Sequence, residues 1–262
     1  MNFKLPNRKA LLSMRTLRLV LVAMGIIIVV FNDTLGKQEG FVEFLLLYFI
    51  TVIITTIHWL FVNIKLIINL KSEKTKAELK HLQSQVNPHF FFNMLNNLYG
   101  LVDKDSEKAK KLILKLSDMM RYSIYEGQQP QVTLGKEIAF LRNYIELHHM
   151  RYHKDIAIDF DVNVDNEHLK LAPLLFIILV ENAFKHGVEK LRQNAFVKIA
   201  ITSEQNRVSI KVENNFDPDD PLEKGIGLQN LRRRMELVYP NTHNLTHSIK
   251  GTVYTAELTL DV

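Results

Sequence analysis

The side chain best suited to chemistry in this sequence is the imidazole of His89. It lies in the run Asn-Pro-His-Phe-Phe-Phe-Asn at positions 87–93, where apolar neighbours would fix its ring. A neutral imidazole is a nucleophile near pH 7, so His89 could attack a phosphoryl group. Asn93 follows four residues later, on the same helical face, and could orient a phosphate or a water. The alternative is a structural histidine packed among phenylalanines, which is the commoner role of a single histidine.

A second group of polar side chains follows an apolar run at 171–178. The segment 179–187 reads Leu-Val-Glu-Asn-Ala-Phe-Lys-His-Gly, which predicts a helix that ends just before Gly187. Spacing of four residues pairs Glu181 with Lys185 and Asn182 with His186 on one surface. Asn182 could complete a hydrated Mg²⁺ shell, and Lys185 could pair with a phosphate. The alternative is an ordinary ion pair on a solvated helix.

The third segment, Gly-Ile-Gly-Leu-Gln-Asn-Leu at 225–231, opens a predicted helix. Apolar residues recur there at helical spacing, at Leu228, Leu231, Met235 and Val238. Gly225 and Gly227 would let backbone N–H groups approach a phosphate at the positive end of that helix. A lone Gly-x-Gly also fits a plain loop before a helix.

Taken in this order, the three segments resemble the LytS-type sensor histidine kinases, whose chains carry a Pro-His-Phe-x-Phe-Asn phosphoacceptor segment before a GHKL-type ATP-binding domain. The resemblance covers roughly residues 77–260 and includes the stretches 116–122 and 144–151. It implies an ATP-dependent protein-histidine kinase that phosphorylates His89 and passes the phosphoryl group to an aspartate of a response regulator. It further implies ATP and Mg²⁺ as cofactors, Glu181 and Asn182 as the N-box pair, Lys185 and His186 as nucleotide contacts, and Gly225 and Gly227 as the phosphate-side loop.

One segment departs from the family pattern. Where GHKL domains carry Asp-x-Gly-x-Gly, with the aspartate accepting a hydrogen bond from the adenine amino group, this chain reads Val-Glu-Asn-Asn-Phe at 212–216. Either Glu213 serves there as a longer carboxylate, or adenine is held in a different way. The departure also leaves open a membrane-anchored dimeric signalling scaffold with a degenerate nucleotide pocket. A GHKL ATPase that hydrolyses ATP instead of transferring the phosphoryl group is a third possibility.

The N-terminal part predicts a membrane anchor of two transmembrane helices, at about 17–35 and 44–65. Residues 44–62 carry no formal charge and would extend about 28 Å as a helix, close to the thickness of a bilayer core. A signal peptide is the alternative for the first span, but no Ala-x-Ala-like cleavage site follows it. Basic residues precede the first span and follow the second, which favours a multi-pass protein of the cell membrane with both termini in the cytoplasm.

The charge and amino-acid composition limit the kinds of partner that the chain could bind. The chain of 262 residues has a net charge of +5 and contains no cysteine, which excludes disulfides and thiolate metal sites. Much of the positive charge is juxtamembrane and would favour anionic lipid surfaces of the bilayer. Basic and aromatic residues are not interleaved, so we expect no nucleic-acid binding.

Periodicity predicts a membrane-anchored chain of class α plus α/β. We expect a membrane anchor at 1–70, dimerisation and histidine-phosphotransfer helices at 71–130, and an ATP-binding domain at 131–262. In the middle region, a second helix at 106–125 would pair with the helix of His89 as a hairpin, and two hairpins would form a homodimeric four-helix bundle. In the last, strands near 156–162, 197–201, 208–212 and 254–260 alternate with helices, which predicts a two-layer α/β sandwich. The resemblance implies that this sandwich is of the GHKL type. Residues 216–224 would form a lid over the nucleotide.

Overall fold

The computed structural model describes residues 8–83, 88–152, 156–191, 193–219 and 226–262, and the chain divides into two compact units, residues 1–73 and 74–262. The first contains α1 (Arg8–Val30), the short α2 (Asn32–Leu35) and the beginning of α3 (Phe41–Gln83). Within this unit the Tyr48 hydroxyl donates a hydrogen bond to the Leu21 carbonyl, 3.0 Å away, and the Arg18 guanidinium lies 5.0 Å from the centre of the Trp59 ring. These contacts join α1 to α3.

One helix in the described part of the chain is long and apolar enough to cross a membrane. It covers residues Phe41–Lys80, with a mean hydropathy of 2.2 over its most apolar window, and no part of that window is buried within the protein. The first predicted span, 17–35, corresponds to a shorter apolar helix, Thr16–Val30, followed by a break before α2. Of the two predicted spans, only the second therefore has the expected length and hydropathy.

The second unit begins with the end of α3 and a helical hairpin. The hairpin consists of α4 (Pro88–Val102) and α5 (Ser106–Tyr125), and the helix α6 (Leu134–Arg151) packs against both. Asp105 caps α5 by accepting a hydrogen bond from the Lys108 amide at 2.9 Å, and the Thr133 hydroxyl caps α6 by accepting one from the Lys136 amide. One stripe of α5 is buried, consisting of Ala109, Leu112, Leu116, Met119 and Tyr122. Met120, next to Met119 on this helix, is exposed.

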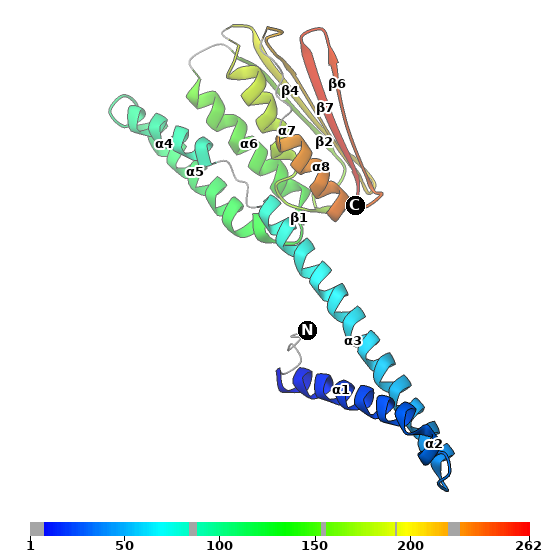
Figure 1. The fold of residues 1–262 in the computed structure, drawn as a ribbon. Helices are drawn as coiled ribbons and strands as arrows, with labels where there is room; N and C mark the ends of the chain where they lie inside the picture. Colours follow the sequence, from blue (N-terminus) through cyan, green and yellow to red (C-terminus); the bar gives the residue numbers. More distant parts are fainter. Residues whose placement is uncertain (1–7, 84–87, 153–155, 192, 220–225) are drawn as a thin grey trace. The chain divides into compact units, whose positions relative to one another are not determined.

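The C-terminal part is a two-layer α/β sandwich, as predicted, and Figure 1 shows α6, α7 and α8 along one face of its sheet. The sheet has the order β2-β4-β5-β7-β6, with β2 and β4 parallel and the remaining pairs antiparallel. Its strands are β2 (Ile156–Val164), β4 (Ala195–Glu204), β5 (Arg207–Asn215), β6 (His243–Lys250) and β7 (Val253–Asp261). The strand β6, which is mostly polar, was not predicted. A separate pair joins β1 (Val132–Thr133) and β3 (Lys170–Leu171).

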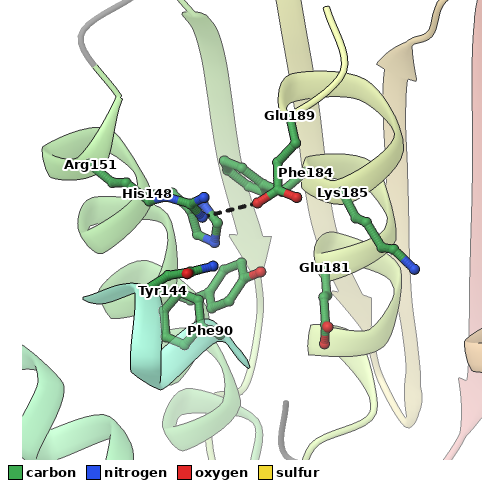
Figure 2. A pocket seen from close by; sticks show the side chains of 9 residues that line it. Phe90, Tyr144, His148, Arg151, Glu181, Phe184, Lys185 and Glu189 are labelled. Atoms are coloured by element: carbon green, nitrogen blue, oxygen red, sulfur yellow. Dashed lines mark hydrogen bonds and ion pairs between the residues drawn. The ribbon is translucent and has the colours of Figure 1, made fainter. Parts of the chain in front are cut away.

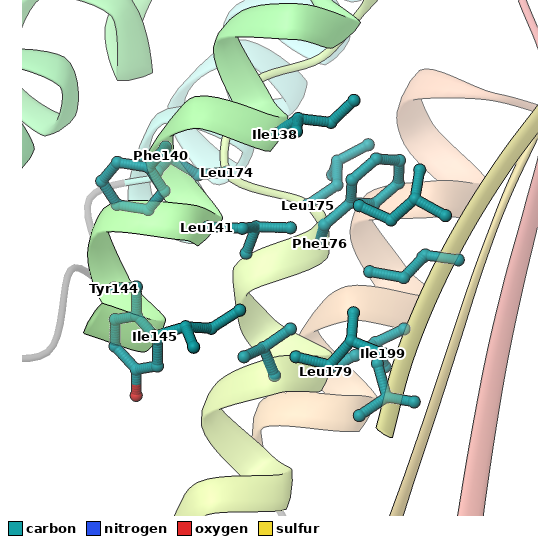
Figure 3. Close-up of a cluster of buried hydrophobic side chains, with 14 of the residues drawn as sticks. Ile138, Phe140, Leu141, Tyr144, Ile145, Leu174, Leu175, Phe176, Leu179 and Ile199 are labelled. Carbon is teal, nitrogen blue, oxygen red and sulfur yellow. The ribbon is translucent and has the colours of Figure 1, made fainter. Parts of the chain in front are cut away.

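The core fills the space between the helices and this sheet face. Alternate residues of the strands point inward, for example Val197, Ile199 and Ile201 of β4, and are almost completely buried. They pack against Leu141 and Ile145 of α6 and against the helix α7 (Phe176–Ala183), as Figure 3 shows. The remaining helical elements are η1 (Glu126–Gln128), the π-helical turn η2 (Phe184–Val188) and α8 (Ile226–Val238). α7 and α8, which carry two of the predicted site segments, are therefore held by the same core.

Candidate functional site

A cavity of about 300 Å³ lies between the helix of His89 and the segment 179–187. α4 contributes Asn93, and the other side contributes Glu181 of α7 and Lys185 of η2, so three predicted site residues meet at one cavity (Figure 2). The rest of its lining consists of Phe90, Tyr144, His148, Arg151, Phe184 and Glu189. His89 is the second residue of α4, four positions before Asn93, and its side chain lies outside the described part of the structure.

Aromatic side chains hold the beginning of α4 against α6 and η2. Phe90, only 6% exposed, stacks on Tyr144 with 4.8 Å between ring centres and lies 5.2 Å from the ring of His148. Phe184 lies 4.3 Å from His148 on the other side. Because Phe90 follows His89 directly, this cluster fixes the position of the backbone next to His89, the candidate phosphoacceptor.

His148 is the least expected member of the site. It is 2% exposed, and neither ring nitrogen has a hydrogen-bond partner within the described structure. Burial, followed by the positive charge of Arg151, lowers its pKa to about 3, so the imidazole is neutral at physiological pH. The sequence reasoning missed His148, although its position four residues after Tyr144 places both on one face of a helix.

Charged groups line the mouth of the cavity. The Arg151 guanidinium forms an ion pair with Glu189 at 3.0 Å, and the Tyr152 hydroxyl donates to the same carboxylate at 3.0 Å. Glu181 and Lys185 add one further charge of each sign. A group entering this cavity would therefore meet both cations and carboxylates.

Asn182 points in a different direction from Glu181. A Cβ atom added to Gly227, near the beginning of α8, would lie 3.4 Å from the Asn182 Oδ1 atom, so the amide and this glycine are neighbours. Adjacent helical residues point roughly 100° apart, which places Glu181 toward α4 and Asn182 toward α8. The prediction of one crowded surface was therefore wrong: the segment presents one side to α4 and another to the beginning of α8.

The end of this segment also differs from the prediction. The helix does not end before Gly187 but continues as the π-helical turn η2, which includes both His186 and Gly187. A Cβ atom at Gly187 would lie 2.7 Å from the backbone carbonyl oxygen of Asn215 and 2.8 Å from the side-chain Nδ2 atom of Asn214. Glycine is required here because β5 approaches the turn closely.

Glu213 does not belong to the site. It lies on the sheet face away from the helices, where it pairs with Lys211 at 2.8 Å. The side chain next to Gly187 is that of Asn214, which is 2% exposed and donates a hydrogen bond to the Asn215 carbonyl at 3.0 Å. The period of two that buries Val208, Ile210 and Val212 also buries Asn214, so continuing the predicted strand by two residues would have found it.

Two further predicted features fall wholly or partly outside the described residues. Gly225 belongs to the undescribed segment 220–225, as does most of the predicted lid at 216–224. Of the predicted glycine pair, only Gly227 can be placed.

The backbone of Gly227 at the beginning of α8 lies beside the Asn182 side chain, and N–H groups at the beginning of a helix suit a nucleotide phosphate. Among the described residues, no group of three or more His, Asp or Glu side chains could hold a metal ion. A Mg²⁺ ion would therefore depend on the phosphate oxygens, on water and on Asn182.

Comparisons with known proteins agree with these observations. Residues 77–156 match the family model described as Histidine kinase. The "Sensor protein LytS" of Staphylococcus haemolyticus is 35% identical over 177 residues, which cover 62% of this chain and 30% of that protein. The "Sensor histidine kinase/phosphatase LytS" of Staphylococcus aureus strain MRSA252 is 38% identical over 140 residues, or 53% of this chain and 24% of that protein.

This chain thus spans about a third of the length of the curated relatives it matches. The solved catalytic domain of the histidine kinase ThkA aligns with 50% of this chain at 19% identity and a TM-score of 0.35, too low to add to the topology described above. Residues 77–156 carry the sequence pattern of the histidine kinases, and the resemblance of this chain to the LytS-type sensor histidine kinases is confirmed.

Proposed function

We propose that this chain is a sensor histidine kinase that phosphorylates His89 from ATP and passes the phosphoryl group to an aspartate of a response regulator. The observation that carries the proposal is the cavity that Asn93, four residues after His89, shares with Glu181 and Lys185. One helix thereby faces both the phosphoacceptor helix and, through Asn182, the glycine-rich beginning of α8.

The proposed chemistry needs positioning and charge neutralisation more than covalent assistance. A ring nitrogen of His89 forms a bond to the γ-phosphorus, while the bond to the β–γ bridging oxygen breaks and its electron pair leaves with ADP. Lys185 and the amides near Gly227 neutralise phosphate charge, and Asn93 orients the group being transferred. Glu181 accepts the proton of the other ring nitrogen or polarises that N–H bond.

Asn182 and His186 would contact the nucleotide, and Mg²⁺ held by Asn182 would neutralise charge on the phosphates when bound. Gly225 and Gly227 would form the phosphate-side loop. The base would lie toward Asn214 and Gly187, because Glu213 is on the opposite face of the sheet.

The partners and the location belong to the same proposal. The chain would anchor itself in the cell membrane through α3 and the shorter α1, with both termini in the cytoplasm, because basic residues flank the two apolar segments. Residues 1–70, 71–130 and 131–262 would act as anchor, phosphotransfer module and ATP-binding domain. A second copy would cover the apolar residues that α4 and α5 expose, which include Phe92, Leu95, Tyr99, Ile113, Leu114, Met120 and Ile124.

The test is incubation of the full chain in lipid vesicles with Mg²⁺ and γ-labelled ATP. We expect a protein-bound label that is acid-labile and alkali-stable, absent from His89→Ala and retained by the control His149→Ala, which alters an exposed histidine. Equal labelling of His89→Ala would refute the assignment. Calorimetry distinguishes the kinase from a scaffold with a degenerate nucleotide pocket. If the chain binds ATP in the presence of Mg²⁺ and Asn182→Ala loses this binding, the scaffold is excluded.

A further inference from the structure

The segment that enters α7 has a strained backbone. Leu174 has a φ of 55°, a conformation that residues other than glycine rarely adopt, and it lies two residues before the first residue of α7. Such a conformation persists only where surrounding contacts hold it. The contacts around Leu174 therefore indicate what fixes the helix that carries Glu181 and Asn182.

A buried carboxylate and a buried guanidinium hold this segment from two other helices. Glu137 of α6, fully buried, accepts hydrogen bonds from the backbone amides of Leu174 at 2.7 Å and Leu175 at 3.3 Å. These amides precede α7, which has no side-chain cap of its own. Arg234 of α8, 1% exposed, donates to the carbonyls of Pro173 at 2.6 Å and Leu174 at 3.2 Å.

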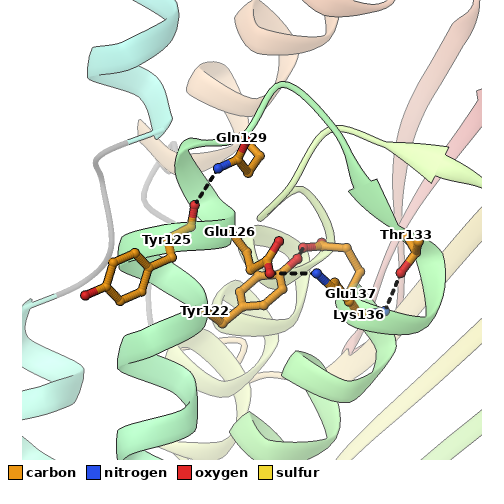
Figure 4. Close-up of polar contacts among 7 residues, drawn as sticks. All are labelled: Tyr122, Tyr125, Glu126, Gln129, Thr133, Lys136 and Glu137. Carbon is orange, nitrogen blue, oxygen red and sulfur yellow. Dashed lines mark hydrogen bonds and ion pairs between the residues drawn. The ribbon is translucent and has the colours of Figure 1, made fainter.

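The phosphotransfer hairpin reaches the same carboxylate. The hydroxyl of Tyr122, near the end of α5, donates to the Glu137 Oε1 atom that also accepts from Leu174 (Figure 4), while its ring stacks on Phe140 at 4.6 Å. A Cβ atom at Gly127, just beyond α5, would lie 2.7 Å from Leu174, so the chain after α5 also packs on this residue. Burial raises the pKa of Tyr122, and the neighbouring Glu137 carboxylate raises it further, so the hydroxyl keeps its proton and remains a donor.

We propose that Tyr122, Glu137, Leu174 and Arg234 form a coupling joint that positions the nucleotide-binding helices α7 and α8 relative to the phosphotransfer helix α5. The proposal rests on the proposed kinase function and adds Tyr122 to it as a positioning residue. Tyr122 touches neither substrate nor reacting atoms. It acts through Glu137, which fixes the beginning of α7, while Arg234 ties the same segment to α8, the helix that begins beside Asn182.

The variant Tyr122→Phe tests the joint in the full chain, because it removes one hydroxyl and keeps the stacked ring. Tyr125→Phe is its matched control, since Tyr125 lies on the same helix and is 67% exposed. In Tyr122→Phe we expect amide hydrogen exchange at Leu174, Leu175 and α7 to accelerate at least tenfold. Labelling of His89 at saturating ATP should slow at least fivefold, while the dissociation constant for Mg-ATP changes less than twofold. Tyr125→Phe should match the unsubstituted chain in all three measurements.

The proposal would be overturned by an exchange change confined to α5 or by labelling at the unsubstituted rate. A parallel loss of ATP affinity and labelling would also overturn it, because that pattern indicates general unfolding. Arg234→Lys, which keeps the charge but loses the forked contact with two carbonyls, should also accelerate exchange at Leu174 and Leu175. If the unsubstituted chain is not labelled at all, the kinase proposal fails, whereas the exchange measurements still decide whether the joint exists.

Discussion

At the scale of single residues, the burial of His148 lowers the stability of the folded protein. Both nitrogens of its buried ring lack partners in the described structure, and an unsatisfied buried polar group costs about 1–3 kcal/mol. Buried polar groups without partners are rare in proteins and are often found at functional sites. His148 lines the cavity beside α4. The cost is therefore located where the proposed reaction takes place.

Replacing His148 should change how stability depends on pH. The folded pKa of about 3 lies below the unfolded value near 6.5, so the unfolded chain binds more protons between these values. The free energy of unfolding should therefore fall as the pH decreases, by about 2 kcal/mol from this group between pH 7 and pH 5. We expect His148→Phe to lack this loss and to be at least as stable at pH 7.

Denaturant unfolding of the full chain in detergent at several pH values measures this effect. The control is His149→Phe, which alters the exposed neighbour and should retain the pH dependence of the unsubstituted chain. Identical pH profiles for His148→Phe and the unsubstituted chain would contradict the burial of a neutral imidazole. Taking the difference between variants removes the contributions of all groups that the variants share.

At the scale of elements, the turn η2 and the strand β5 are packed without space for a side chain at Gly187. Gly187→Ala would force a Cβ atom to within 2.7 Å of a backbone oxygen, and overpacking of this kind costs about 1–3 kcal/mol. We expect the midpoint of denaturation to fall accordingly. Mg-ATP binding should weaken as well, because the same contact positions Asn214.

Gly100→Ala is the matched control for this substitution. Gly100 lies inside α4, and a Cβ atom there would have no neighbour within 4 Å. Alanine should therefore stabilise that helix by about 0.5–1 kcal/mol through its higher helix propensity. If Gly187→Ala were as well tolerated as Gly100→Ala, the close approach of η2 and β5 would be disproved.

At the scale of the whole molecule, the exposed apolar face of α4 and α5 predicts self-association. Leu114 is 67% exposed on α5, and a lysine there would place a charge in the proposed interface. We expect Leu114→Lys to raise the dimer dissociation constant at least tenfold, which corresponds to about 1.4 kcal/mol. Sedimentation of the chain in detergent measures it. Ile249→Lys, at an exposed apolar position on β6, should leave association unchanged, and a dimer insensitive to Leu114→Lys would place the interface elsewhere.

The sequence by itself determined most of the elements and the family that the chain resembles. Period-two alternation predicted four of the five strands of the large sheet, and helical spacing predicted α5 and α8, because burial of one face imposes those periods on any sequence that folds this way. Three segments, at 87–93, 179–187 and 225–231, were enough to indicate a resemblance to the LytS-type kinases. A polar strand such as β6 carries too little of the alternating pattern to be recognised.

Only the tertiary structure decided which side chains meet. Glu181 and Asn182 are adjacent in sequence but face different helices, and Glu213 and Asn214 are adjacent but lie on opposite faces of the sheet. Likewise, Tyr122, Glu137 and Arg234 come from three helices and have no common spacing that a sequence pattern could reveal. A local period fixes the direction of a side chain relative to its own helix or strand, whereas its partners depend on how distant segments pack.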